Sequence, residues 1–132
     1  MPTCTLYALP YQPDPAAYFS CLRDAPGAIL LDSARPGAER GRFDLISAWP
    51  VQHLQVLADE TGRAFLQRLR DALAALGPAQ LPPESELPFA GGLIGYLSYD
   101  FGRRLEHLPT QAVDDLGLPA PQDHVRHFDA AE

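Results

Sequence analysis

Lysine is absent from this sequence, because all ten basic residues among its 132 residues are arginine. Without lysine, the chain cannot form a Schiff base with a carbonyl substrate or supply the lysine of a phosphate-binding loop. Basic side chains are also outnumbered by acidic ones, which gives a formal net charge of -7. Nucleic acids and anionic membranes bind clustered cations, so this charge balance argues against both as partners.

Cysteine and long apolar runs are scarce as well. The two cysteines, Cys4 and Cys21, lie in or beside apolar segments without a CxxC spacing, which favours buried free thiols over a disulfide or a metal site. No apolar run approaches the roughly 18 residues needed to cross a bilayer, and the first residues lack the pattern of a secretory signal. We therefore expect a cytoplasmic protein.

Proline, in contrast, is abundant, and its 14 residues predict short elements joined by stiff loops. Apolar patterning and turn residues predict elements along the whole chain. The predicted strands are 4–9, 28–31, 42–49, 51–58 and 89–99, and the predicted helices are a short one from Pro15, a long one over 63–76 and a short one capped by Asp100. Because strands follow one another and helices are inserted irregularly, we expect an α+β fold with a largely antiparallel sheet and a few packed helices.

Two segments have little apolar patterning. Residues 78–88 contain four prolines and two glutamates and are predicted to be a linker without chemistry of its own. Residues 109–132 are polar and proline-marked. We therefore expect one domain over 1–108 and a weakly ordered tail over 109–132.

The stretch most typical of a binding site is 29–50, which is predicted to be a strand, a polar loop and a second strand. Asp32 and Ser33 follow the apolar run of the first strand, at the kind of strand-to-loop junction where binding residues often lie. Arg42 begins the second strand and needs Asp32, Asp44 or a ligand carboxylate as a partner if its guanidinium is buried. A guanidinium that lies in water is the simpler alternative.

Other patterns give no support for catalysis. Residues 90–95 (AGGLIG) lack the first glycine of the dinucleotide-binding fingerprint, and Ser98 lacks the glycines of a nucleophile elbow. His124 and His127 have a spacing that could bind a metal from a helix, but a solvated segment explains them more simply. The acidic pair 59–60 is expected to be solvated in a turn. We therefore predict no catalytic residue and no metal site, and a binding or structural domain.

Three sequence blocks resemble the N-terminal region of the chorismate-using aminase subunits, which are component I of anthranilate synthase and component I of para-aminobenzoate (aminodeoxychorismate) synthase. The blocks are 30–33 (LLDS), 41–48 (GRFDLISA) and 91–100 (GGLIGYLSYD). Anthranilate synthases usually read LLES and GRYS at the first two blocks. The sequence is therefore more similar to the para-aminobenzoate branch.

The resemblance also implies a ligand pocket. In anthranilate synthases the first two blocks form part of a tryptophan site used for feedback inhibition, and para-aminobenzoate relatives can hold tryptophan there as a structural ligand. Carried over to this chain, the pocket residues are Leu31, Asp32, Ser33, Phe43 and Asp44. A carboxylate or hydroxyl would bind the ligand's amino group, and the apolar side chains would cover an indole ring.

The resemblance further implies that this chain is the N-terminal, non-catalytic part of a larger chorismate-utilising enzyme fold. The parent enzyme would convert chorismate and ammonia to 4-amino-4-deoxychorismate for folate synthesis, with ammonia from a partner glutamine amidotransferase. Mg²⁺ and the catalytic residues would belong to a C-terminal domain, so no cofactor is expected in this chain. A sheet edge left bare without that domain predicts self-association of the fragment.

Two other functions stay open at this point. The chain could be the corresponding part of anthranilate synthase component I, with a tryptophan feedback site. It could also be a stand-alone module that binds a small molecule.

Overall fold

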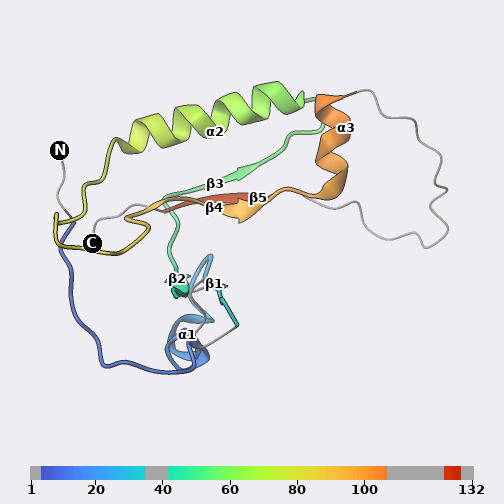
Figure 1. Ribbon diagram of the computed structural model, residues 1–132. Coiled ribbons are helices and arrows are strands. Elements are labelled where there is room, and N and C mark those ends of the chain that lie inside the picture. The colour runs from blue at the N-terminus through green and yellow to red at the C-terminus, as the bar shows by residue number, and fades with distance from the viewer. Residues whose placement is uncertain (1–3, 35–41, 107–123, 129–132) are drawn as a thin grey trace, which may run out of the picture.

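The computed structural model describes residues 4–34, 42–106 and 124–128 (Figure 1). Its elements, in chain order, are α1 (Ala16–Leu22), β1 (Ile29–Leu31), β2 (Leu45–Ser47), β3 (Gln52–Gln55), α2 (Gly62–Leu76), β4 (Gly92–Tyr96), a 3₁₀ turn (Tyr99–Phe101), α3 (Gly102–Leu105) and β5 (His124–Phe128). Every strand pair among them is antiparallel. The chain is therefore a mixed α+β protein with antiparallel strands, as predicted.

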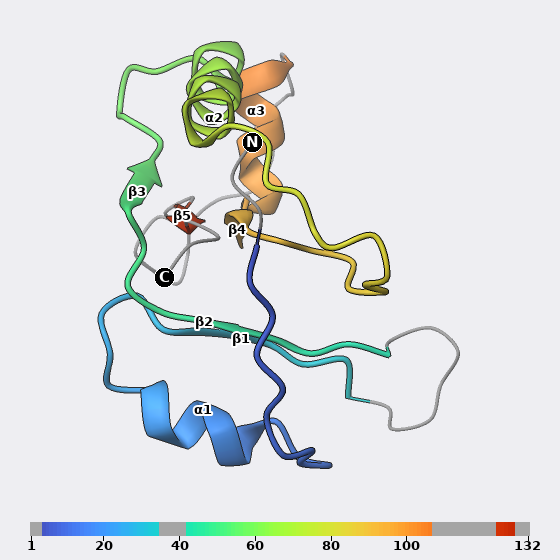
Figure 2. The same cartoon turned by 90° about the vertical axis from the view of Figure 1, so that its left-hand side faces the viewer.

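The elements are arranged in layers. Both views place them in the order α2, the sheet of β3, β5 and β4, the β1–β2 ladder, and α1 (Figures 1 and 2). The segment that joins β2 to β3 leads the chain from the lower pair of layers to the upper pair. The two strands of the predicted binding stretch therefore belong to the lower pair, away from the longest helix.

The β1–β2 ladder follows the sequence prediction closely. Ile29 lies opposite Ser47, and Leu31 lies opposite Leu45. The Leu31–Leu45 pair is therefore the end of the ladder that adjoins the predicted polar loop. The second strand is shorter than predicted, because ladder pairing is limited to the three residues of β1. The helix before this ladder begins at Ala16, one residue later than predicted, with Pro15 rather than Asp14 at its N-cap position. The Ala16 N–H still donates to Oδ1 of Asp14 at 2.9 Å.

The other sheet contains a strand that the sequence analysis did not anticipate. β5 lies between β3 and β4, with Leu54 opposite Val125 and Ile94 opposite Arg126. β5 belongs to the segment that was expected to be a polar tail. A central strand with a polar sequence has no alternation to reveal it, and its partners are far away in the chain.

α2 is the helix that the sequence predicts best. Its N-terminus is capped by the Thr61 side chain, which accepts from the Ala64 N–H at 3.1 Å, and it ends at Gly77 with a φ of 76°. The buried stripe of the helix packs in a core made of Leu54, Phe65, Ala72 and Phe101. The rings of Phe65 and Phe101 meet edge to face, with their centroids 5.8 Å apart.

The predicted strand over 4–9 is wrong. Residues 4–10 form no strand, although the Cys4 N–H donates to the carbonyl of Gln80 at 3.0 Å. This segment belongs to neither of the two described sheets, so its β-prone residues are not held in a ladder. Both cysteines are free thiols, as predicted, but neither is buried, because Cys4 is half-buried and Cys21 is exposed.

The prediction that Asp100 caps a helix is also wrong. Asp100 lies inside the 3₁₀ turn, and its carboxylate accepts from Nε of Arg103 at 3.0 Å instead of binding a backbone N–H. Among the described residues, no helix is long and apolar enough to span a membrane.

Candidate functional site

The strand ends of the β1–β2 ladder bring together the residues predicted to form a pocket. Beyond the Leu31–Leu45 pair, the Ser33 N–H donates to Oδ1 of Asp44 at 2.8 Å. The Ser33 hydroxyl donates to the carbonyl of Phe43. Ser33 therefore joins the two chain segments with both its backbone and its side chain, and it fixes Phe43 and Asp44 opposite the first strand.

Asp32 shapes the start of the loop. Its Oδ1 accepts from the Ala34 N–H at 2.7 Å, which is the local contact that aspartate often makes in a turn. Ala34 has a φ of 55°, in the left-handed region that costs energy for a residue with a Cβ. The carboxylate of Asp32 therefore stabilises a strained turn at the edge of the candidate site.

Arg42 has a partner that the sequence analysis missed. Its Nη2 lies 3.1 Å from Oε2 of Glu86, and its guanidinium carbon lies 5.3 Å from the centroid of the Phe43 ring. The predicted intramolecular partners were Asp32 and Asp44, but the contact comes from the proline-rich segment that was expected to have no chemistry. The Arg42 side chain is 59% exposed, which agrees with the simpler alternative of a solvated guanidinium.

The resulting surface has the groups that an amino acid would need. Asp32 and Asp44 are exposed carboxylates, Arg42 is an exposed cation, and Leu31 and the half-buried Phe43 offer apolar surface. Carboxylates can bind an ammonium group, and a guanidinium can bind a carboxylate with paired hydrogen bonds. The structure thus places the predicted site residues at one strand-to-loop junction, and ligand binding there stays a prediction.

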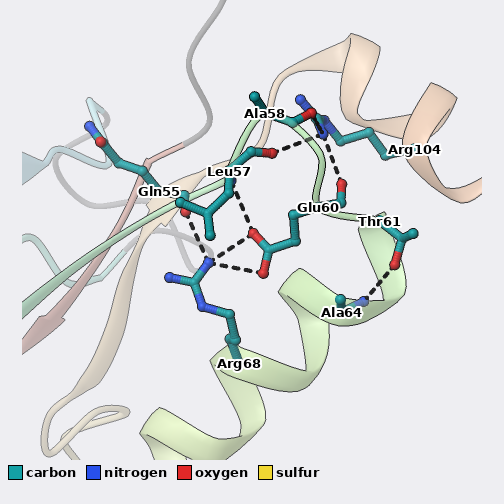
Figure 3. Close-up of polar contacts among 8 residues, drawn as sticks. All are labelled: Gln55, Leu57, Ala58, Glu60, Thr61, Ala64, Arg68 and Arg104. Carbon is teal, nitrogen blue, oxygen red and sulfur yellow. Dashed lines mark hydrogen bonds and ion pairs between the residues drawn. The ribbon is translucent and has the colours of Figure 1, made fainter.

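A second polar cluster lies at the turn between β3 and α2 (Figure 3). Glu60, which was expected to be solvated, has a side chain that is only 7% exposed and an Oε2 that lies 2.8 Å from Nη1 of Arg68. The same carboxylate accepts from the Leu57 N–H at 3.0 Å. Glu60 precedes the helix and lies eight residues before Arg68, so no i,i+3 or i,i+4 spacing connects the two in the sequence.

Electrostatics hold Glu60 in its charged form. Burial raises the pKa of the carboxyl, but the Leu57 N–H and the positive charges of Arg68 and Arg104 outweigh burial and lower the pKa below its ordinary value. Arg104 also donates to the carbonyls of Leu57, Ala58 and Glu60, at 3.2, 3.3 and 2.8 Å. The cluster therefore joins α2 and α3 to the turn before α2, and we assign it a structural role.

The remaining sequence patterns also have structural explanations. The glycine-rich block leads into β4, and Gly91, just before the strand, and Gly92, its first residue, have φ values of 118° and 146°, which L side chains rarely adopt. A Cβ at Gly92 would lie 3.4 Å from the ring of Phe89. Within the described part of the chain, no group of three or more His, Cys, Asp or Glu residues could hold a metal ion.

An apolar hollow of about 630 Å³ lies at the C-terminal end of α2. It is lined by α2 residues including Leu73 and by Phe89 and Gly91 from the segment before β4, and Arg70 is the one charged residue in its lining. It is separate from the strand-to-loop junction that holds the predicted site.

Comparison with known proteins finds relatives over most of the chain. It is 38% identical over 125 residues to aminodeoxychorismate synthase component 1 of Klebsiella aerogenes, a match that covers 86% of this chain and 28% of the relative. It is 36% identical over 117 residues to anthranilate synthase component 1 of Mycobacterium tuberculosis, which covers 79% of this chain and 23% of the relative. The Escherichia coli aminodeoxychorismate synthase component 1 is 35% identical over 112 residues. No protein-family model matches the chain.

These matches cover only part of each relative, and they include both kinds of synthase. The chain spans between a fifth and a third of the length of each of these relatives, with values of 28%, 23% and 25%. Both kinds of synthase occur among them at similar identity.

Proposed function

We propose that this chain, which is homologous to the N-terminal portion of component 1 of aminodeoxychorismate synthase and anthranilate synthase, acts as the non-catalytic N-terminal domain of an aminodeoxychorismate synthase component 1. The homology over most of the chain is the observation that carries this proposal. Identities of 38% and 36% are too close to choose between the two synthases. The choice rests on the LLDS and GRFD blocks, which resemble the para-aminobenzoate branch.

The proposed whole enzyme adds ammonia to chorismate and forms 4-amino-4-deoxychorismate, with ammonia supplied by a glutamine amidotransferase subunit. Mg²⁺ would hold and polarise the chorismate in the catalytic portion. The described residues of this chain contain no cluster that fits the ion, so we assign no Mg²⁺ ligand to them. In this proposal the chain contributes structure and a ligand pocket, and it contributes no catalytic residue.

The exposed apolar surface supports a role as a domain that packs against other protein. Several large apolar side chains in the described ranges are more than half exposed, and Tyr99 is 97% exposed. The others include Tyr7, Leu9, Tyr11, Trp49, Val51, Leu57 and Tyr96. In the proposed whole enzyme these side chains would pack against the further domain or the partner subunit, and in the isolated chain they would favour self-association.

The strand-to-loop junction is proposed as an amino-acid pocket, with L-tryptophan as its ligand. Asp32 and Asp44 would bind the ammonium group, Arg42 would bind the carboxylate, and Leu31 and Phe43 would contact the indole ring. In an aminodeoxychorismate synthase this ligand would be structural. Tryptophan would stabilise the protein without inhibiting it.

The second candidate is the same domain of an anthranilate synthase component 1, favoured by the 36% identity to the mycobacterial enzyme. In that function the pocket would be regulatory, and tryptophan would inhibit the enzyme.

Growth complementation tests the proposed function and separates the candidates. The gene should restore growth without para-aminobenzoate to a bacterium that lacks aminodeoxychorismate synthase component 1. It should not restore growth without tryptophan to a strain that lacks anthranilate synthase component 1. The reverse pattern would select the second candidate, and growth in neither strain would favour a stand-alone binding module.

A further inference from the structure

We propose that the Glu86 carboxylate forms an ion pair with the Arg42 guanidinium in the free protein. The carboxylate of an amino-acid ligand displaces Glu86 from Arg42 on binding. This inference rests on the proposed pocket and adds a competing group from another part of the chain. Arg42 Nη2 lies 3.1 Å from Glu86 Oε2, and the two residues are 44 positions apart. Glu86 thus contacts the one side chain that the proposed pocket offers to a ligand carboxylate.

The pair is built to exchange partners at little energetic cost. The side chains are 59% exposed at Arg42 and 80% exposed at Glu86, so water solvates both groups when they separate. Exposed ion pairs of this kind contribute little to stability. The carboxylate of a free amino acid offers the same two oxygens, and it can make the same charge-assisted hydrogen bonds.

Arg42 keeps a second contact after Glu86 leaves. Its guanidinium carbon lies 5.3 Å from the centroid of the neighbouring Phe43 ring, within the range of a cation–π interaction. That contact comes from the pocket residue next to Arg42 in the chain, and it does not depend on Glu86. The cation therefore stays beside the Phe43 ring, where a ligand carboxylate can reach it.

The charge pattern of the site makes the competition selective. Arg42 is the sole cation within 29–34 and 42–47, whereas Asp32 and Asp44 are both acidic. Among the described residues of the site, Arg42 is therefore the charged group that favours a ligand carboxylate, and Glu86 competes for it. A ligand without a carboxylate makes no use of Arg42, so its binding would not depend on the Arg42–Glu86 contact.

Calorimetric titration of the polypeptide that the gene encodes tests this inference, with L-tryptophan and tryptamine as probes. Tryptamine has the indole and the amine but no carboxylate. Glu86→Gln should tighten L-tryptophan binding by about two- to fivefold, the range that exposed ion pairs imply, and should not tighten tryptamine binding. Glu84→Gln removes the same charge from the same segment without breaking the Arg42 contact, and it should leave both affinities near those of the unsubstituted protein.

The outcomes separate the displacement from the pocket itself. If L-tryptophan binds equally well to the Glu86→Gln and unsubstituted proteins, the displacement is refuted while the pocket stands. Equal tightening by Glu84→Gln would refute it too, because a general charge effect would then explain the gain. If neither probe binds any variant, the pocket and the displacement fall together. Unfolding midpoints of all variants, measured beside the titrations, should agree closely because both glutamates are exposed.

Discussion

The backbone N–H of Ser33 lies 2.8 Å from Oδ1 of Asp44, across the two chain segments that leave the β1–β2 ladder. This bond continues the strand pairing by means of a side chain where the ladder itself has ended. It places Asp44 beside Ser33, and both residues belong to the ligand pocket that the sequence resemblance predicts. The same carboxylate is therefore available as a structural anchor and as a ligand group.

Substitution of Asp44 tests its structural role and separates the effect of its hydrogen-bond acceptor from the effect of its charge. Asp44→Ala should lower the free energy of unfolding by about 1 kcal/mol, because the Ser33 N–H loses its acceptor. Asp44→Asn keeps a carbonyl oxygen in the same place and should restore most of that loss. Urea unfolding of both variants provides the measurement. An asparagine variant as unstable as the alanine variant would show that the charge, rather than the acceptor, is what matters.

Glu60 should make the free energy of unfolding depend on pH in the acid range. Because its folded pKa lies below its ordinary value of 4.5, the unfolded chain binds the proton more readily than the folded chain does. The carboxylate therefore stabilises the fold above that ordinary value, and the contribution is lost as the pH falls through the lower folded pKa. Unfolding free energies measured from neutral pH into the acid range should show this loss.

Glu60→Gln identifies the responsible group. The difference in stability between the unsubstituted protein and this variant should be largest near neutral pH and should shrink in acid. Glu84→Gln, which removes an exposed carboxylate, should leave the pH profile unchanged. A difference for Glu60→Gln that stays constant at all pH values would contradict the assignment.

Gly62 lies where α2 meets α3, and a side chain does not fit there. A Cβ at this position would lie 2.6 Å from Cδ2 of Leu105 and 3.0 Å from the carbonyl oxygen of Arg104. Gly62→Ala should therefore destabilise the protein by about 1 kcal/mol, even though alanine is the better helix former.

The double variant Gly62→Ala with Leu105→Ala checks the cause of that loss. Removing the Leu105 side chain relieves the closer contact, so the two substitutions should be less destabilising together than the sum of their separate effects. Strict additivity would show that the alanine at position 62 acts through something other than Leu105.

Phe65 should be the most sensitive core position. Its side chain is fully buried, and its ring packs against Phe101, so Phe65→Ala should lower stability by about 3–5 kcal/mol. Tyr99→Ala is a matched control, because that ring is 97% exposed and its loss should change stability by less than about 0.5 kcal/mol. Thermal unfolding of both variants should show this contrast, and comparable losses would contradict the described core.

Local signals explain which elements the sequence could predict. α2 has a capping threonine, an apolar stripe and a terminal glycine, and all of these act within a few residues. The β1–β2 ladder could be predicted for a similar reason, since two apolar segments flank one polar loop. These features depend on neighbours in sequence, and the structure confirms them.

The features that sequence reasoning missed depend on distant partners. β5 is a central strand only because β3 and β4 lie on both sides of it. The Arg42–Glu86 contact joins segments on either side of α2, and no spacing rule connects them. The residues of the candidate site could be identified from the blocks 30–33 and 41–48, whereas Glu86 could be found only from the fold.

Product analysis tests the central claim most directly. The polypeptide that the gene encodes would be supplied with chorismate, Mg²⁺ and ammonia, and the 132-residue chain would be assayed beside it under the same conditions. Our proposal predicts 4-amino-4-deoxychorismate from the gene product and no product from the 132-residue chain. Anthranilate as the product would contradict the assignment to aminodeoxychorismate synthase, and turnover by the 132-residue chain alone would contradict its non-catalytic role.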